Sequence, residues 1–116
     1  MSQELEARLD ELRQQASKYA KAEADRTYLE NFKRSKLAML MKVAEKTLGL
    51  STVNAQEREA RTHPEYLELL DGLKEATQIA EENKWLLQIA MRGSSLYQTQ
   101  QATKRAEMQA YNSPES

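Results

Sequence analysis

The sequence predicts an all-α protein: a long antiparallel helical hairpin, similar to a coiled coil, with a short connecting helix, which assembles into an oligomer. Apolar residues recur at alternating steps of three and four, which is the spacing of a coiled-coil seam. The chain of 116 residues has only three Gly and two Pro. With 40% hydrophobic residues, one Trp and one Phe, it can bury a thin seam but hardly a thick globular core.

The first predicted helix covers residues 2–48. No Gly or Pro lies between Ser2 and Leu48, and Gly49 then supplies a helix stop. The start of its seam consists of Leu5, Leu9, Leu12, Ala16 and Tyr19. The seam continues, after a slip in the repeat, with Ala22, Leu29, Phe32, Lys36, Leu40 and Val43.

The predicted connector covers residues 49–63. Ser51 or Thr52 can cap a short helix from Val53 to about Arg61. The side chains of this helix are mostly charged, so we expect it to connect the long helices and to add little to the core.

The second long helix is predicted over residues 64–110. Thr62 and Glu65 match a capping box, Pro64 suits the first turn, and His63 is interpreted as a helix-start residue. The seam of this helix consists of Tyr66, Leu69, Leu73, Ala76, Ala80, Asn83, Leu87, Ala90, Ser94 and Tyr97. Residues 1–111 are thus predicted to form one hairpin domain, followed by a disordered tail at 112–116.

Apolar residues also flank the second seam and widen it beyond what one partner helix can cover. These residues are Leu70, Ile79, Leu86 and Ile89. We therefore predict that they form an interface between copies, in a homo-oligomer that is a dimer or a larger ring.

Charge is segregated along the chain although 17 Lys and Arg nearly balance 18 Asp and Glu. Residues 18–46 hold eight basic and four acidic residues, residues 55–82 hold three basic and eight acidic, and residues 83–105 hold four basic and none acidic. The basic zone at 18–46 has two interpretations. Its cations are either paired with carboxylates on the helix surface, or they form a phosphate-binding surface for nucleic acid.

The amino-acid composition gives little support for a catalytic function. The chain has no Cys and a single His, which excludes thiolate and histidine-based metal sites and a cysteine nucleophile. It also lacks a Gly-rich phosphate loop. We therefore expect no enzyme, no catalytic residue, no cofactor and no metal.

The longest apolar run, Leu37–Met41, is too short to cross a membrane, and no targeting signal is expected at the start, so we expect a cytoplasmic protein.

Two segments carry a family resemblance. Residues 28–42 read YLENFKRSKLAMLMK, and a later HPEY at residues 63–66 precedes KWLL at residues 84–87. They resemble small helical tailed-phage proteins encoded among recombination genes, and the spacing loosely resembles the UvsY recombination mediator family over residues 19–105. The resemblance implies an oligomeric mediator in the host-cell cytoplasm that binds single-stranded DNA. It also implies partners, namely a phage recombinase or a single-strand-binding protein.

By this resemblance the nucleic-acid residues are Lys33, Arg34, Lys36 and Lys42, and the basic zone adds Arg26 and Lys46. The leading hypothesis is therefore a non-enzymatic phage DNA-recombination accessory protein. The alternative is a phage protein-binding module, such as an inhibitor of a host defence protein or a coiled-coil scaffold.

Overall fold

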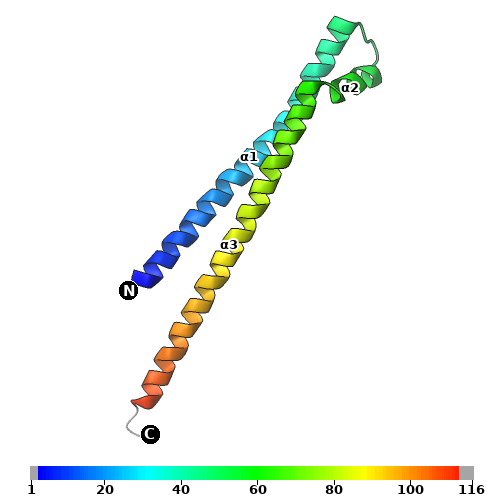
Figure 1. Cartoon of the computed structure of the whole chain (residues 1–116). Coiled ribbons are helices and arrows are strands. Elements are labelled where there is room, and N and C mark those ends of the chain that lie inside the picture. Colours follow the sequence, from blue (N-terminus) through cyan, green and yellow to red (C-terminus); the bar gives the residue numbers. More distant parts are fainter. Residues whose placement is uncertain (1–2, 113–116) are drawn as a thin grey trace. The chain divides into compact units, whose positions relative to one another are not determined.

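The computed structural model describes residues 3–112, and these residues form three α-helices and no strand. Helix α1 spans Gln3–Leu48, α2 spans Val53–Arg61 and α3 spans Pro64–Tyr111 (Figure 1). The described boundaries agree with the predicted ones within one residue. Four residues of the predicted disordered tail, 113–116, lie outside the described residues, as does the predicted helix start at Ser2.

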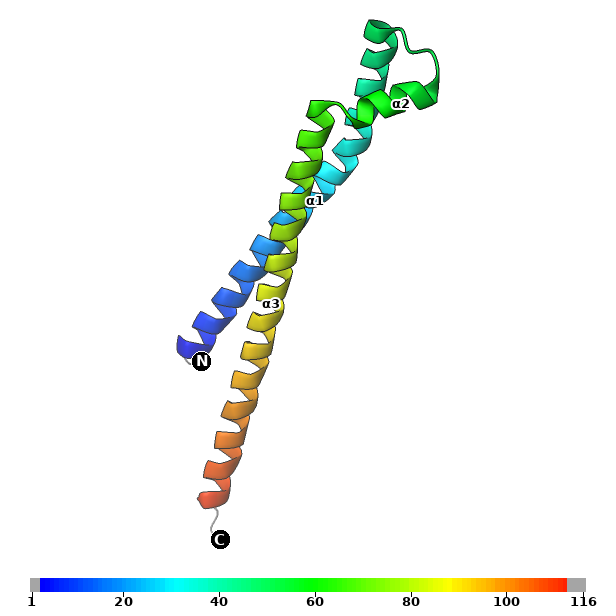
Figure 2. The same ribbon diagram turned by 45° about the vertical axis from the view of Figure 1, so that its right-hand side comes forward.

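The chain divides into two compact units, each containing a part of α1 and a part of α3. The first unit comprises the described residues up to Tyr19 and from Asn83 onward, and the second comprises Ala20–Glu82. In the second unit, α1 and α3 run side by side in both views (Figures 1 and 2). They are antiparallel, since Lys36 meets Glu65 near the connector while Asp25 and Ile79 share a groove farther from it.

The predicted seam of α3 is confirmed. Every one of its ten positions is buried or half-buried, and Tyr66, Leu73, Ala80, Ser94 and Tyr97 are among the most buried residues described. The repeat therefore sets which side of this helix faces α1 within each unit.

The predicted seam of α1 needs a correction. Ala16 and Val43 are exposed, and half-buried polar residues take part in the repeat. One row of half-buried and buried positions consists of Leu5, Arg8, Leu12, Gln15, Tyr19, Ala22, Arg26, Leu29, Lys33, Lys36 and Leu40. Its steps alternate between three and four through Ala22, where the apolar residues alone indicate a slip, and the alternation ends at Leu40, since the next buried residue of α1 is Ala44. Long polar side chains continue the row because they cover a seam with their aliphatic stems.

Backbone chemistry explains how α1 ends and α2 begins. Gly49 has a φ of +69°, a left-handed conformation that glycine adopts without steric cost, and Leu50 N–H donates to the Ala44 carbonyl at 3.4 Å. Thr52 then caps α2, because its Oγ1 accepts from Ala55 N–H at 3.2 Å. Of the two predicted caps, the structure selects Thr52.

The predicted capping box at Thr62 and Glu65 is wrong. The Thr62 hydroxyl donates backward to the Arg58 and Glu59 carbonyls, so Thr62 closes α2. His63 starts α3 instead: its Nδ1 accepts from Glu65 N–H at 3.1 Å, and its carbonyl accepts from Tyr66 and Leu67. A His ring nitrogen can accept this bond as a Ser or Asp oxygen does.

Helix α2 contributes more to the core than its charged sequence predicts. Ala60 is only 1% exposed and forms a cluster with Leu40 of α1 and Tyr66 of α3. Gln56 is also buried, and its Nε2 donates to the Leu50 carbonyl at 2.9 Å. The connector is thus packed against both long helices at the closed end of the second unit.

Candidate nucleic-acid interface

The six cations predicted to bind nucleic acid fall into two groups in the second unit. Arg26, Lys33 and Lys36 are half-buried along the α1 seam. Each faces a carboxylate: Arg26 pairs with Glu23, Lys33 Nζ lies 3.6 Å from Glu30 Oε1, and Lys36 Nζ lies 2.9 Å from Glu65 Oε2. For these three residues the paired interpretation of the basic zone holds.

The Lys36–Glu65 pair joins α1 to α3. Lys36 is the more buried partner, and its ammonium reaches the exposed Glu65 carboxylate at the start of α3. The hydrogen bond and the positive charge of Lys36 lower the pKa of Glu65 from its ordinary value. Lys36 therefore acts as a polar seam residue that crosses to the partner helix.

The other three cations, Arg34, Lys42 and Lys46, are exposed. None of them forms an ion pair with the described residues. They lie on the side of α1 that faces away from the α3 seam, since their positions fall between the buried positions of the repeat. These three side chains are available to an anionic ligand.

An exposed aromatic ring accompanies them. Tyr28 is 66% exposed, and its ring stacks on that of Phe32 with centroids 6.1 Å apart and planes within 8°. Lys21, Tyr28, Ser35 and Lys42 are spaced by seven residues and are all exposed, so they form one row along the helix. We call this row, together with Arg34 and Lys46, the outer face of α1.

The sequence itself contains a signal for this aromatic platform. Tyr28 and Phe32 are four residues apart, and side chains at that spacing meet on a helix surface. Phe32 is half-buried, and the exposed Tyr28 ring stacks on it.

The residues predicted to join copies have mixed environments. Ile79, Leu86 and Ile89 are exposed, Ile89 by 63%. Leu70 is half-buried and packs against the core cluster of Leu40, Ala60 and Tyr66. In the first unit, Trp85 and Leu96 add to the exposed apolar surface of α3.

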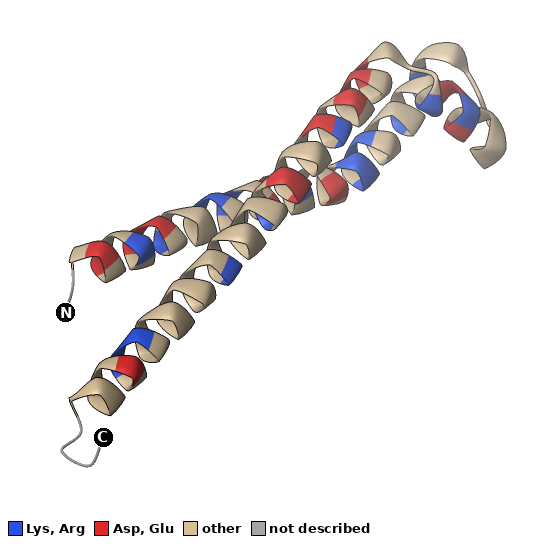
Figure 3. Ribbon diagram, turned by 60° about the horizontal axis from the view of Figure 1, so that its bottom comes forward, with Lys and Arg blue, Asp and Glu red and all other residues tan. Residues whose placement is uncertain are grey.

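Residues 83–106 of α3 are also free of carboxylates. After Glu82 the ribbon carries basic residues and no acidic one until Glu107 (Figure 3). Lys84, Arg92, Lys104 and Arg105 form no ion pair with the described residues. The first unit thus exposes apolar and positively charged side chains together.

No protein-family model, curated protein or solved structure matches the chain. Function therefore has to be argued from the chain's own residues. In residues 3–112, no helix is long and apolar enough to cross a membrane. In the same range, His, Asp and Glu side chains form no group of three that could hold a metal ion.

Proposed function

We propose that the chain is a non-enzymatic accessory protein of phage DNA recombination, which binds single-stranded DNA as a homo-oligomer. The outer face of α1 carries this proposal, because it combines Arg34, Lys42 and Lys46 with the exposed ring of Tyr28. The set of cations proposed to bind DNA is therefore smaller than the set of six that the sequence predicted. Arg26, Lys33 and Lys36 support the fold through their carboxylate partners.

The chemistry of the outer face suits a flexible single strand. Cations that meet phosphates release condensed counterions, which drives binding and makes it salt-dependent. A base can stack on an exposed aromatic ring whatever its identity. A row of cations with one aromatic platform thus favours single-stranded DNA without sequence preference.

The recombination context rests on the resemblance of residues 28–42, 63–66 and 84–87 to small tailed-phage proteins encoded among recombination genes, and on the loose resemblance of the spacing over residues 19–105 to the UvsY mediator family. The outer face lies largely within the first of these segments. In this role the protein would meet a phage recombinase or a single-strand-binding protein in the host cytoplasm and would help to exchange one for the other on DNA.

Fluorescence anisotropy with a labelled oligothymidine tests the proposal. The triple variant Arg34→Ala, Lys42→Ala, Lys46→Ala should lose at least about tenfold in affinity, and its log–log salt slope should fall by about two, since each phosphate contact to a single strand contributes about 0.7. Tyr28→Leu should weaken binding by about fivefold or more through lost stacking, with the salt slope unchanged.

A charge-matched control uses Arg13→Ala, Arg58→Ala and Lys74→Ala, three exposed cations outside the outer face. This triple variant should bind within about twofold of the wild type, as expected for surface charges that do not contact the ligand. Equal losses in the two triple variants, or no binding at low salt, would contradict the proposal.

A protein-binding module is the second candidate, as an inhibitor of a host defence protein or a coiled-coil scaffold. The exposed apolar residues Trp85, Leu86, Ile89 and Leu96 favour it, because contiguous exposed apolar surface marks interaction sites. A stoichiometric protein retained from nuclease-treated host lysate, and lost with Trp85→Ala and Ile89→Ala, would support this candidate over DNA binding.

A further inference from the structure

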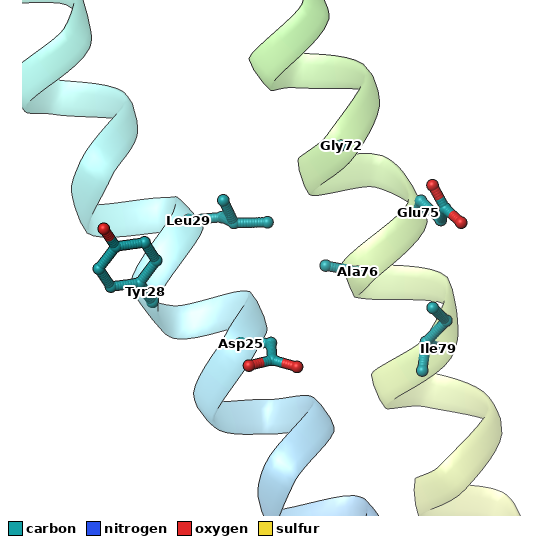
Figure 4. A pocket seen from close by; sticks show the side chains of 7 residues that line it. All are labelled: Asp25, Tyr28, Leu29, Gly72, Glu75, Ala76 and Ile79. Atoms are coloured by element: carbon teal, nitrogen blue, oxygen red, sulfur yellow. The ribbon is translucent and has the colours of Figure 1, made fainter.

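A furrow runs along the second unit between α1 and α3. One part of it has a volume of about 350 Å³ and is lined by Asp25, Tyr28 and Leu29 from α1 and by Gly72, Glu75, Ala76 and Ile79 from α3. Leu29 and Ala76 point toward each other across it (Figure 4). The furrow continues past Gly72 into a second hollow of about 410 Å³, lined by Phe32, Leu69 and charged side chains.

The furrow has an apolar floor and an acidic rim. Asp25 and Glu75 border the first hollow, and Glu65 and Glu68 border the second. The one cation that lines it, Lys36, is paired with Glu65. The furrow therefore fits a helix that presents apolar side chains flanked by positive charge.

Gly72 lies between the two hollows and contributes to both. A Cβ placed on Gly72 would meet no atom within 4 Å, so packing inside the chain does not require a glycine at this position. Glycine in a helix interior costs about 1 kcal/mol relative to Ala. The missing side chain deepens the furrow at this position, where it leaves room for another molecule.

A helix of the required kind is present in the first unit. Trp85, Ile89, Arg92 and Leu96 follow steps of four, three and four along α3 and are all exposed. They form one stripe on the helix surface, and residues 83–106 contain no carboxylate. The apolar and basic stripe complements the apolar and acidic furrow.

The stripe cannot reach the furrow of its own chain. Residues 64–111 form one continuous helix, and residues 85–96 follow the furrow residues 72–79 along its axis. A straight helix cannot fold back on itself without breaking its backbone hydrogen bonds. The stripe that fills a furrow must therefore come from a second copy.

We infer that two copies pair antiparallel along α3, each laying Ile89, Arg92 and Leu96 of its stripe into the furrow of the other, with Trp85 near the two-fold axis. The arrangement is a closed two-fold dimer in which both copies use the same surfaces. Ile89 of one copy meets Ile79 of its partner, Leu96 enters the space above Gly72, and Arg92 lies beside Glu75. The inference specifies the self-association in the proposed function and rests on that part of it alone.

Engineered cysteines test this geometry, because the chain has no Cys of its own. Chains with Ile79→Cys and chains with Ile89→Cys are mixed, unfolded and refolded together, and oxidised. The mixture should give a disulfide-linked dimer. Ile79→Cys alone should not, since the two copies of residue 79 would lie about 15 Å apart along the axis, ten residues at 1.5 Å each, beyond the reach of a disulfide.

A variant that fills the furrow provides an independent test, in which sedimentation equilibrium measures the dissociation constant of the dimer. Gly72→Leu should weaken dimerisation by about tenfold or more. The variant should stay helical by circular dichroism, because a Cβ at residue 72 meets no atom within 4 Å and Leu is a better helix former than Gly. The control Thr77→Leu adds the same side chain at an exposed position that does not line the furrow, and should change the dissociation constant less than about twofold.

Three outcomes would overturn the inference: a monomeric wild type at tens of micromolar, cross-linking of Ile79→Cys with itself, or Gly72→Leu dimerising as tightly as Thr77→Leu. Arg34, Lys42 and Lys46, which the DNA-binding test changes, lie outside the furrow, and the cysteine test uses residues of α3. A loss of DNA binding with the dimer intact would therefore contradict DNA binding alone, whereas a monomeric wild type would contradict both the inference and the homo-oligomer of the proposed function.

Discussion

Arg8 shows how single polar residues are accommodated in the α1 seam. Its guanidinium lies 4.4 Å from the centre of the Tyr97 ring, and the Tyr97 hydroxyl donates to Glu4 at 3.2 Å. Arg8 Nε and Gln15 Oε1 are nevertheless buried without a hydrogen-bond partner among the described residues. Since such groups lose hydration without compensation, the seam of the first unit is less stabilising than an apolar seam of the same length.

At the same scale, the Lys36–Glu65 pair predicts a pH dependence. Because the pKa of Glu65 is lowered in the folded state, its contribution to stability is complete above the ordinary pKa of a glutamate. The contribution is lost as the pH falls through the lowered value. Glu65→Gln should therefore lower the thermal midpoint at pH 7 by more than at pH 3, which melting curves followed by circular dichroism can check.

Glu68→Gln provides the control, because Glu68 is an exposed carboxylate nearby that forms no ion pair with the described residues. Its effect at pH 7 should be smaller than that of Glu65→Gln. An effect of Glu65→Gln that is the same at pH 3 and pH 7 would show that the ion pair does not stabilise the fold.

At the scale of the element, the register of α1 can be tested by one pair of substitutions. Leu40 is buried in the cluster with Ala60 and Tyr66, whereas Val43, three residues on, is 51% exposed. Leu40→Ala should reduce the free energy of unfolding by about 2–4 kcal/mol, since it leaves a cavity. Val43→Ala should change it by less than about 0.5 kcal/mol.

Urea denaturation of both variants measures the difference. Comparable losses at the two positions would mean that Val43 belongs to the seam, as apolar periodicity alone predicts. The α1 seam contains Arg, Lys and Gln, so apolar residues alone do not fix the phase of its repeat. The α3 seam is mostly apolar, and there the sequence predicted every position.

At the scale of the whole molecule, the structure predicts where the chain opens most readily. The core cluster and the buried residues Tyr66, Leu73 and Ala80 lie in the second unit, while residues 102–111 of α3 are helical and exposed throughout. Hydrogen exchange followed by mass spectrometry should show slow exchange around residues 66–80 and fast exchange over residues 102–111. Equal protection of the two segments would mean that residues 102–111 are covered by another molecule.

The sequence alone determined the element pattern of this protein. Gly49, Pro64 and the repeats of three and four fix where the helices end and which side of α3 is buried, because these are local properties of the backbone and of helix periodicity. The sequence also predicted the basic zone, the apolar residues that flank the α3 seam and the position of His63 at a helix start.

Only the tertiary structure decided how those residues are used. Lys36 meets Glu65 across 29 positions of the chain, Ala60 completes a core from a helix that its sequence marks as a connector, and Gly72 opens a furrow beside α1. Burial, concavity and the Lys36–Glu65 pair depend on the three-dimensional proximity of distant segments. Arg26 and Lys33 pair with Glu23 and Glu30 of the same helix. Their half-buried positions, like that of Lys36, separate them from the exposed Arg34, Lys42 and Lys46, which remain available to a ligand.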